Sequence, residues 1–376
     1  MILPFIGGQM KTIVKAIELS NAVTKVVKAI SSKGQNPVLE CIKLTCRGDN
    51  LTLLATDTEI SIEKTIPAET FMEGETLVNG KIFYDFIKKL EAEDELELYL
   101  EDTRLKITYS SSFGYINALE ATDFPMVRKD LKENSFSMLQ KDFKDLVSRT
   151  AFCCLQDDSR PILKGCLIEA DGDMINCVAL DGFRLAFCKQ PYKSLSGTIK
   201  AIVPSRALNE LLRLLDKDED TVTIFIQDGK LMVEVFNTIL TARLLEGEYI
   251  DYRHIIPDKF VTEFMANKII FENAVSRAAV VAKAMTNNMV VFDVKEDSLN
   301  VSSSTDIGTV NENVLIELHG KDVTIAFNSR YILDCMHAIN DDFVIFSLNS
   351  PIAPCIITPH DETENSLYLV LPIRMN

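Results

Sequence analysis

The chain contains no tryptophan among its 376 residues and only four histidines, none of which lies four positions from another. Nine cysteines are present, but no two of them form a Cys-x-x-Cys pair, so no familiar metal-ligand spacing occurs. No apolar run reaches the roughly 18 residues that a membrane helix requires. The first nine residues also lack the basic segment and long apolar core of a signal peptide. These absences argue against a membrane protein and against a zinc site.

Familiar catalytic motifs are missing as well. The sequence has no Gly-x-x-x-x-Gly-Lys-Ser/Thr phosphate loop, no Gly-x-Ser-x-Gly turn and no His-Glu-x-x-His pair. An enzyme is therefore disfavoured, and we expect no cofactor and no metal. The odd number of cysteines, most of them inside apolar runs, indicates small buried thiols in a reducing cytoplasm. They are Cys41, Cys46, Cys153, Cys154, Cys166, Cys177, Cys188, Cys335 and Cys355.

A strand–turn–strand pattern occurs three times, with aspartate in each turn. Asp57, Asp181 and Asp306 are separated by 124 and 125 residues. The points where a strand leads into a helix repeat at 125 and 123 residues, at Thr76, Ala201 and Thr324. Two landmarks with one period indicate three similar domains. The expected divisions are an extension without function at 1–9, then domains at 10–132, 133–259 and 260–376.

Each domain is expected to have an α+β fold, with two helices packed on antiparallel sheets of roughly eight strands. The apolar spacing predicts two helices in each repeat. Their expected ranges are 19–33, 80–90, 139–153, 204–217, 272–286 and 328–340.

The formal net charge is −16, which taken alone argues against nucleic acid. The expected helices together, however, contain 15 basic and 7 acidic residues, whereas the remainder of the chain contains 24 basic and 48 acidic residues. Lys25 and Lys28 share one helical face, and Lys141 and Lys144 share the corresponding face in the second repeat. The alternative for any single helix is an ordinary solvated face. For six helices together we interpret the pattern as a basic lining that attracts a polyanion without fixing its register.

The chain resembles the bacterial DNA polymerase III beta subunit family, the replication sliding clamps, over residues 10–376. The resemblance rests on the threefold repeat and on three local motifs. These are Asp181-Gly182-Phe183-Arg184-Leu185-Ala186, Tyr252-Arg253 before Pro257, and Leu371-Pro372-Ile373-Arg374.

The resemblance implies a head-to-tail homodimer that closes into a ring of six domains, with helices lining a hole that encircles duplex DNA. Such a protein is a non-enzymatic processivity factor that tethers the replicative polymerase. It also implies partners that insert short peptides with a glutamine and apolar anchors, namely polymerase III subunits, the clamp loader, other polymerases and repair proteins. No membrane partner is implied.

Local alignment with the family places a peptide pocket between the second and third domains. Its members would be Leu163, Leu180, Gly182, Phe183, Arg184, Leu185, Ile250, His254, Ile255, Pro354, Val370, Leu371, Pro372, Ile373 and Arg374. The family often has threonine at position 180 and histidine at position 183, so this pocket is expected to be more apolar. The alternative for each apolar member is ordinary core.

The charge pattern and the alignment together give the expected DNA-facing and dimer-forming residues. The DNA-facing residues are Lys25, Lys28, Lys33, Lys141, Lys144, Gln156, Arg160, Arg206 and Arg213. The dimer contact would involve Phe113 of one chain and Val280 and Val281 of the other.

Two alternatives remain at this point. One is a peptide-binding scaffold that does not encircle DNA. The other is an α+β enzyme in which Asp181, Arg184 and Asp306 converge, although aspartate in equivalent turns of separate domains is better explained as a turn former.

Overall fold

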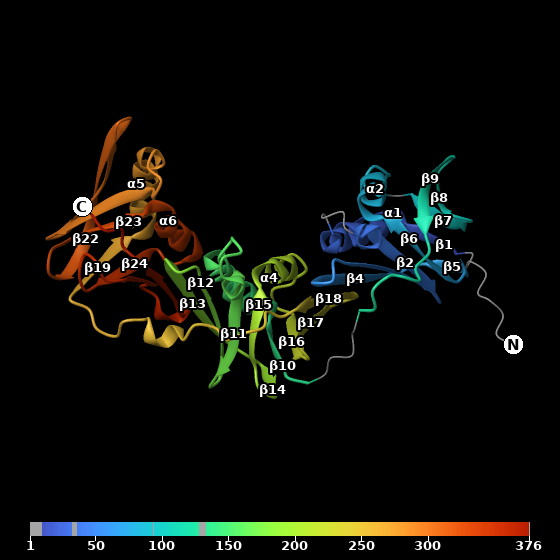
Figure 1. Ribbon diagram of the computed structural model, residues 1–376, viewed down its shortest axis with the longest axis horizontal. Helices are drawn as coiled ribbons and strands as arrows, with labels where there is room; N and C mark the ends of the chain where they lie inside the picture. Colours follow the sequence, from blue (N-terminus) through green and yellow to red (C-terminus); the bar gives the residue numbers. More distant parts are fainter. Residues whose placement is uncertain (1–9, 32–35, 93, 128–132, 376) are drawn as a thin grey trace. The chain divides into compact units, whose positions relative to one another are not determined.

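The computed structural model describes residues 10–31, 36–92, 94–127 and 133–375 (Figure 1). The chain folds into two compact units, which we describe separately. Unit 1 consists of Met1–Ser137, Ser194–Gly197 and Glu210–Leu244, and unit 2 of Met138–Lys193, Thr198–Asn209 and Leu245–Asn376. The middle of the chain is therefore shared, and β10 (Ser135–Leu139) and α4 (Ser205–Leu212) each run from one unit into the other.

Unit 1 contains one long antiparallel sheet with the strand order β14-β10-β16-β17-β18-β4-β3-β2-β6-β9-β8-β7-β1-β5. Besides β10, its strands are β1 (Lys11–Lys15), β2 (Cys41–Arg47), β3 (Asn50–Thr56), β4 (Ile60–Pro67), β5 (Glu69–Met72), β6 (Gly74–Asn79), β7 (Glu95–Glu101), β8 (Arg104–Tyr109), β9 (Ser112–Leu119), β14 (Ser194–Ser196), β16 (Thr221–Gln227), β17 (Lys230–Val235) and β18 (Thr238–Arg243). The β18–β4 ladder joins the first repeat to the second, with Leu240 opposite Ile62.

Two helices of unit 1, α1 (Ala16–Val26) and α2 (Gly80–Ile87), pack against each other and α1 packs on β3 and β4. Leu19, Val23 and Val26 recur at intervals of three and four and are fully buried on the sheet side of α1. This apolar stripe explains why the segment is helical and which face it buries.

Unit 2 contains a second antiparallel sheet with the order β15-β11-β12-β13-β26-β25-β24-β19-β22-β21-β20-β23. Its strands are β11 (Gly165–Asp171), β12 (Met174–Leu180), β13 (Arg184–Pro191), β15 (Lys200–Pro204), β19 (Thr262–Asn267), β20 (Met289–Lys295), β21 (Ser298–Thr305), β22 (Gly308–Gly320), β23 (Val323–Asn328), β24 (Phe343–Leu348), β25 (Cys355–Pro359) and β26 (Ser366–Val370). The β13–β26 ladder joins the second repeat to the third within this unit.

The helices of unit 2 are α3 (Gln140–Ser148), α5 (Lys268–Ala282) and α6 (Ser329–Ala338), and α5 packs on α6 and on β20 to β22. A run of stacked aromatic rings fills the core beneath α5, where Phe264 and Phe346 lie 4.7 Å apart between ring centroids. The short 3₁₀ helices of the chain are η1 (Val27–Ala29), η2 (Pro37–Glu40), η3 (Ala151–Cys153), η4 (Pro161–Lys164), η5 (Tyr252–His254) and η6 (Glu362–Glu364).

The repeated aspartate turn has the same hydrogen bonds in the first two repeats. Asp57 Oδ1 accepts from the backbone N–H groups of Glu59 and Ile60, and Asp181 Oδ1 accepts from those of Phe183 and Arg184. These are local side-chain-to-backbone bonds of the kind that make aspartate a turn former. The structural interpretation of these two carboxylates is therefore confirmed.

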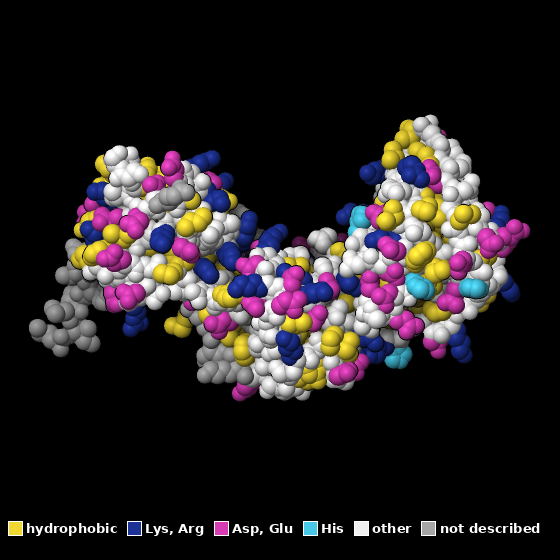
Figure 2. All heavy atoms as spheres, turned by 180° about the vertical axis from the view of Figure 1, so that it is seen from behind, with side chains coloured by type: hydrophobic (Ala, Val, Ile, Leu, Met, Phe, Trp, Pro, Cys, Tyr) yellow, Lys and Arg dark blue, Asp and Glu magenta, His cyan; other side chains and the backbone are white. Residues whose placement is uncertain are grey.

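The expected helices were too long, and this overturns the charge argument built on them. Within the observed bounds of α1 to α6 there are eight basic and seven acidic residues. Six of the other cations follow the helix ends, where a positive charge complements the partial negative charge of the helix C-terminus, at Lys28, Lys88, Lys89, Arg149, Arg213 and Lys283. Lys217 lies further beyond α4, and Lys33 lies outside the described residues. Acidic and basic side chains are also intermixed on the face shown in Figure 2. The expectation that the helices together carry a clear excess of positive charge is therefore wrong.

Asparagine caps the N-terminus of one helix in unit 1 and of two in unit 2. The side-chain oxygens of Asn79, Asn267 and Asn328 accept hydrogen bonds from the first turns of α2, α5 and α6. We expect Asn79→Ala to lower the free energy of unfolding by about 1 kcal/mol, because the amide of Ile82 loses its partner. Urea unfolding measures this, with Asn79→Asp as the control that keeps a capping oxygen. Equal stability of the two variants would contradict the capping role.

All nine cysteines are unpaired and buried, as the sequence indicated. Burial raises the pKa of the Cys355 thiol well above its ordinary value, so this side chain is an inert part of the core. None of the helices in the described part of the chain is long and apolar enough to cross a membrane.

Candidate functional site

The candidate site is built around the β12–β13 hairpin of unit 2, which we call the docking hairpin (residues 174–191). Leu180 and Leu185 face each other in the last register pair before the turn. Gly182 has a φ of +96°, a conformation that residues with a Cβ rarely adopt, and it is followed directly by Phe183. The turn therefore presents Phe183 outward while directing the next side chain back into the protein.

The C-terminal segment runs beside this hairpin and ties it to the third repeat. The backbone N–H of Leu371 donates to the carbonyl of Phe183 at 2.8 Å, directly after β26 ends. Two residues later the N–H of Ile373 donates to the carbonyl of Ala326 on β23, also at 2.8 Å. Leu371 thus lies next to Phe183, although the two are far apart in sequence, while Ile373 lies beside β23.

Several of the predicted pocket residues form one buried apolar cluster. Leu163, Leu180 and Leu185 belong to it, and Ile356 and Leu369 of the third repeat complete it. Leu185 is only 2% exposed, so this residue packs beneath the surface and does not line it. Val370 is also fully buried.

Other predicted members lie at the surface of the protein. Phe183 is 60% exposed, Ile250 and Ile255 are each 38% exposed, and Leu371 is 36% exposed. Pro354, Pro372 and Ile373 are half-buried, while Gly182, His254 and Arg374 are exposed. We call Phe183, Ile250, Ile255 and Leu371 the exposed apolar rim, because exposed apolar side chains of this kind are suited to bind apolar peptide anchors.

Arg184 lies in the interior and makes three polar contacts. Its side chain is 7% exposed, with Nε donating to Asp181 at 2.9 Å, Nη1 to Asp334 at 2.5 Å and Nη2 to the carbonyl of Phe152 at 3.1 Å. Its guanidinium carbon lies 4.5 Å from the ring centroid of Tyr331. Arg184 thus connects the docking hairpin to α6 and supports the site from below.

Burial disfavours the charged guanidinium of Arg184, but Cys153 and the two carboxylate partners outweigh it and raise its pKa above the ordinary value. The ring of Tyr331 also stacks on Phe183, with centroids 6.4 Å apart. Neither Tyr331 nor Asp334 was expected at this site. Nothing in their local sequence marks them, because their role depends on how α6 packs against the docking hairpin.

The segment that carries Ile250 and His254 is joined to β11 by hydrogen bonds. The hydroxyl of Tyr249 donates to the carbonyl of Gly165 at 3.3 Å, and that of Tyr252 donates to Glu169 at 2.8 Å. Burial and the hydrogen bond to Glu169 raise the pKa of Tyr252. His254 Nδ1 lies 2.8 Å from Asp251 at the surface.

The predicted DNA-facing residues fall in both units. Lys25, Lys28 and Arg213 lie in unit 1, where the Arg213 guanidinium pairs with Glu210. Lys141, Lys144, Gln156, Arg160 and Arg206 lie in unit 2, and Lys33 lies outside the described residues. Arg160 is close to the docking hairpin, because a Cβ on Gly182 would lie 3.9 Å from its Nη1.

The predicted dimer residues include exposed apolar side chains on two different elements. Phe113 on β9 is 60% exposed and packs edge-on against Tyr115, with Lys106 over its ring at 5.2 Å. Val280 on α5 is 67% exposed, and its neighbour Val281 is half-buried and faces the turn at Gly308.

The enzyme alternative is not favoured by this geometry. The carboxylate of Asp181 is engaged by the turn and by Arg184.

Comparison with known proteins identifies this arrangement. Three family models match in order, and they describe the N-terminal domain (10–128), the central domain (137–251) and the C-terminal domain (253–374) of the DNA polymerase III beta subunit. A beta sliding clamp of Staphylococcus aureus is 30% identical over 360 residues, covering 93% of this chain and 95% of the relative.

Solved structures agree over the whole chain. The DNA polymerase sliding clamp of Bacillus subtilis has a TM-score of 0.94 and 26% identity, covering 98% of this chain and all of that one. A sliding clamp of Pseudomonas aeruginosa bound to griselimycin has a TM-score of 0.92 and 26% identity, with the same coverage. The chain therefore belongs to the DNA polymerase III beta subunit family of replication sliding clamps.

Proposed function

We propose that this chain is a DNA sliding clamp, a non-catalytic processivity factor that closes as a head-to-tail homodimer around duplex DNA in the cytoplasm. The observation that carries the proposal is the match of all three beta-subunit domains, in order, over nearly the whole chain. A heterologous contact that closes produces a ring, and a ring holds DNA by topology instead of by tight phosphate contacts. The mixed charge of the helices is compatible with this, because tight binding of phosphates would oppose sliding.

We further propose that polymerase III, the clamp loader and other partners dock on the exposed apolar rim around the docking hairpin. Phe183 and Leu371 are adjacent through the backbone hydrogen bond between them, and both are exposed. Arg184, which pairs with Asp334, and the buried apolar cluster that contains Leu185 and Leu369 fix the strands that adjoin the two residues. Partners tethered in this way gain effective concentration at the DNA without needing high affinity for it.

For the dimer contact we propose that Phe113 on β9 of unit 1 packs against Val280 and Val281 of a second chain. The support is that Phe113 and Val280 are large apolar side chains exposed on a strand and a helix, with the half-buried Val281 beside Val280. A solution mass of one chain at micromolar concentration and low salt would argue against the ring.

The test of encirclement compares circular with linear DNA. Protein loaded by a bacterial clamp loader onto nicked circular plasmid should co-elute with the plasmid. Cutting the plasmid once should lower the amount of retained protein roughly tenfold or more. A ring slides off a free end, whereas a protein held by phosphate contacts stays bound. Equal retention on both forms would support a scaffold that does not encircle DNA.

A further inference from the structure

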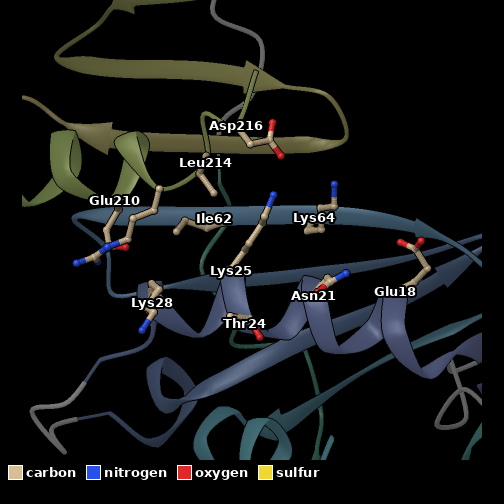
Figure 3. A pocket seen from close by; sticks show the side chains of 11 residues that line it. Glu18, Asn21, Thr24, Lys25, Lys28, Ile62, Lys64, Glu210, Leu214 and Asp216 are labelled. Carbon is tan, nitrogen blue, oxygen red and sulfur yellow. The ribbon is translucent and has the colours of Figure 1, made fainter. Parts of the chain in front are cut away.

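Unit 1 contains a pocket with a volume of about 500 Å³ between α1, β4 and the segment that follows α4 (Figure 3). We call it the two-lysine pocket, because Lys25 of α1 and Lys64 of β4 both line it, together with Glu18, Asn21 and Asp216. All of its lining residues belong to unit 1. Its size is within the range of pockets that hold small-molecule ligands.

The two lysines lie on the same side of the pocket, in the neighbourhood of the carboxylates of Glu18 and Asp216. In Figure 3 their ammonium groups point to the same side, toward Asp216, whereas Lys28 points the other way. Both side chains are half-buried, and neither makes an ion pair within the described part of the chain. Lys43 of β2, by contrast, is half-buried in the same unit and pairs with Glu75 at 2.7 Å.

The electrostatics of Lys64 reflect this arrangement. Burial, followed by the repulsion from Lys25, lowers the pKa of Lys64, and the attraction of Glu18 and Asp216 opposes the shift without cancelling it. An anion between the two ammonium groups would remove their repulsion and form charge-assisted hydrogen bonds with both.

We propose that the two-lysine pocket binds a nucleotide, with a phosphate between Lys25 and Lys64. A phosphate ester fits better than a bare polyanion, because Glu18 and Asp216 at the pocket wall would accept hydrogen bonds from hydroxyl or amino groups beside the phosphate. The nucleotide is one that is free in solution and offers such groups beside its phosphate. This goes beyond the proposed function, because encircling DNA requires no pocket for a single nucleotide.

The test is a calorimetric titration of the full-length protein at low salt with ATP, with inorganic triphosphate and with a short DNA duplex. We expect ATP to bind more tightly than inorganic triphosphate. Lys25→Met and Lys64→Met should each lower the affinity for ATP about tenfold. Lys43→Met is the matched control and should leave the affinity unchanged. At alkaline pH, binding of ATP should also take up protons in the wild type and fewer in Lys64→Met. The bound anion raises the pKa of Lys64, which burial and the repulsion from Lys25 had lowered.

The probes separate a nucleotide pocket from general contact with DNA. Loss of ATP binding in both variants supports the pocket, whereas loss of duplex binding alone would mean that the two lysines contact only DNA and would overturn it. If neither ligand is affected by Lys25→Met or Lys64→Met, or if Lys43→Met has the same effect, the pocket assignment is overturned. Retention on circular plasmid is measured in parallel on the wild type, so that failure of the clamp function is seen separately.

Discussion

Replacing Arg184 by methionine should lower the free energy of unfolding of unit 2 by about 3 kcal/mol. The side chain is buried and its guanidinium is the shared partner of Asp181 and Asp334, 2.9 and 2.5 Å away. Methionine fills much of the space but removes the cation from Asp181, leaves Asp334 with only the more distant Arg330, and leaves the carbonyl of Phe152 without its donor. The removal of one partner from a buried ion pair costs far more than the pair itself contributes.

The measurement is urea unfolding followed by a signal from unit 2, with Arg330→Met as the matched control. Arg330 also approaches Asp334, at 4.0 Å, but its side chain is 75% exposed, so its loss should change stability little. If Arg184→Met is no more destabilising than Arg330→Met, the buried network does not hold the docking hairpin to α6.

The topology of the repeat was accessible from sequence because its turns depend on local chemistry. The side chains of Asp57 and Asp181 each accept hydrogen bonds from the backbone N–H groups of the second and third residues after them. Such bonds depend only on neighbours in sequence. The apolar stripes of the helices also follow from local spacing. For this reason the threefold repeat and the α+β fold class could be predicted without coordinates.

Helix ends were less predictable, and the error had a functional consequence. The first helix was expected at 19–33, but α1 spans Ala16–Val26 and a 3₁₀ turn replaces its continuation. A lysine one turn beyond a helix end continues the helical pattern of the sequence while serving as a cation at the C-terminus. Counting such residues as helical created an apparent basic lining that the observed bounds do not support.

The ladders between repeats could not be read from the sequence. β18 pairs with β4 in unit 1, and β13 pairs with β26 in unit 2, so the second repeat contributes to both sheets. Pairing between distant strands depends on edge backbone groups and leaves no periodic signal in either strand. The roles of Asp334 and Tyr331 could not be predicted for a similar reason, because they depend on how α6 packs against the docking hairpin.

Truncating both exposed anchors, with Phe183→Ala and Leu371→Ala in one protein, should weaken binding of a partner peptide roughly a hundredfold or more. The peptide is a short labelled one that carries a glutamine and apolar anchors, and its binding is measured by fluorescence polarisation. Phe183 and Leu371 are suited to this test because they are exposed, so their truncation opens no cavity in the core. Leu185 is not suited, because it is buried and its truncation would cost stability of its own.

Phe71→Ala is the matched control, since Phe71 is a comparably exposed phenylalanine on β5 of unit 1. It should leave peptide affinity unchanged, and the double variant should keep the solution mass and the urea midpoint of the wild type. Because Phe183 stacks on Tyr331, a Tyr331→Leu variant should show an intermediate loss if the stacked ring orients the anchor. Unchanged affinity in the double variant would remove the docking site from the hairpin, while leaving the family membership and the encirclement of DNA untouched.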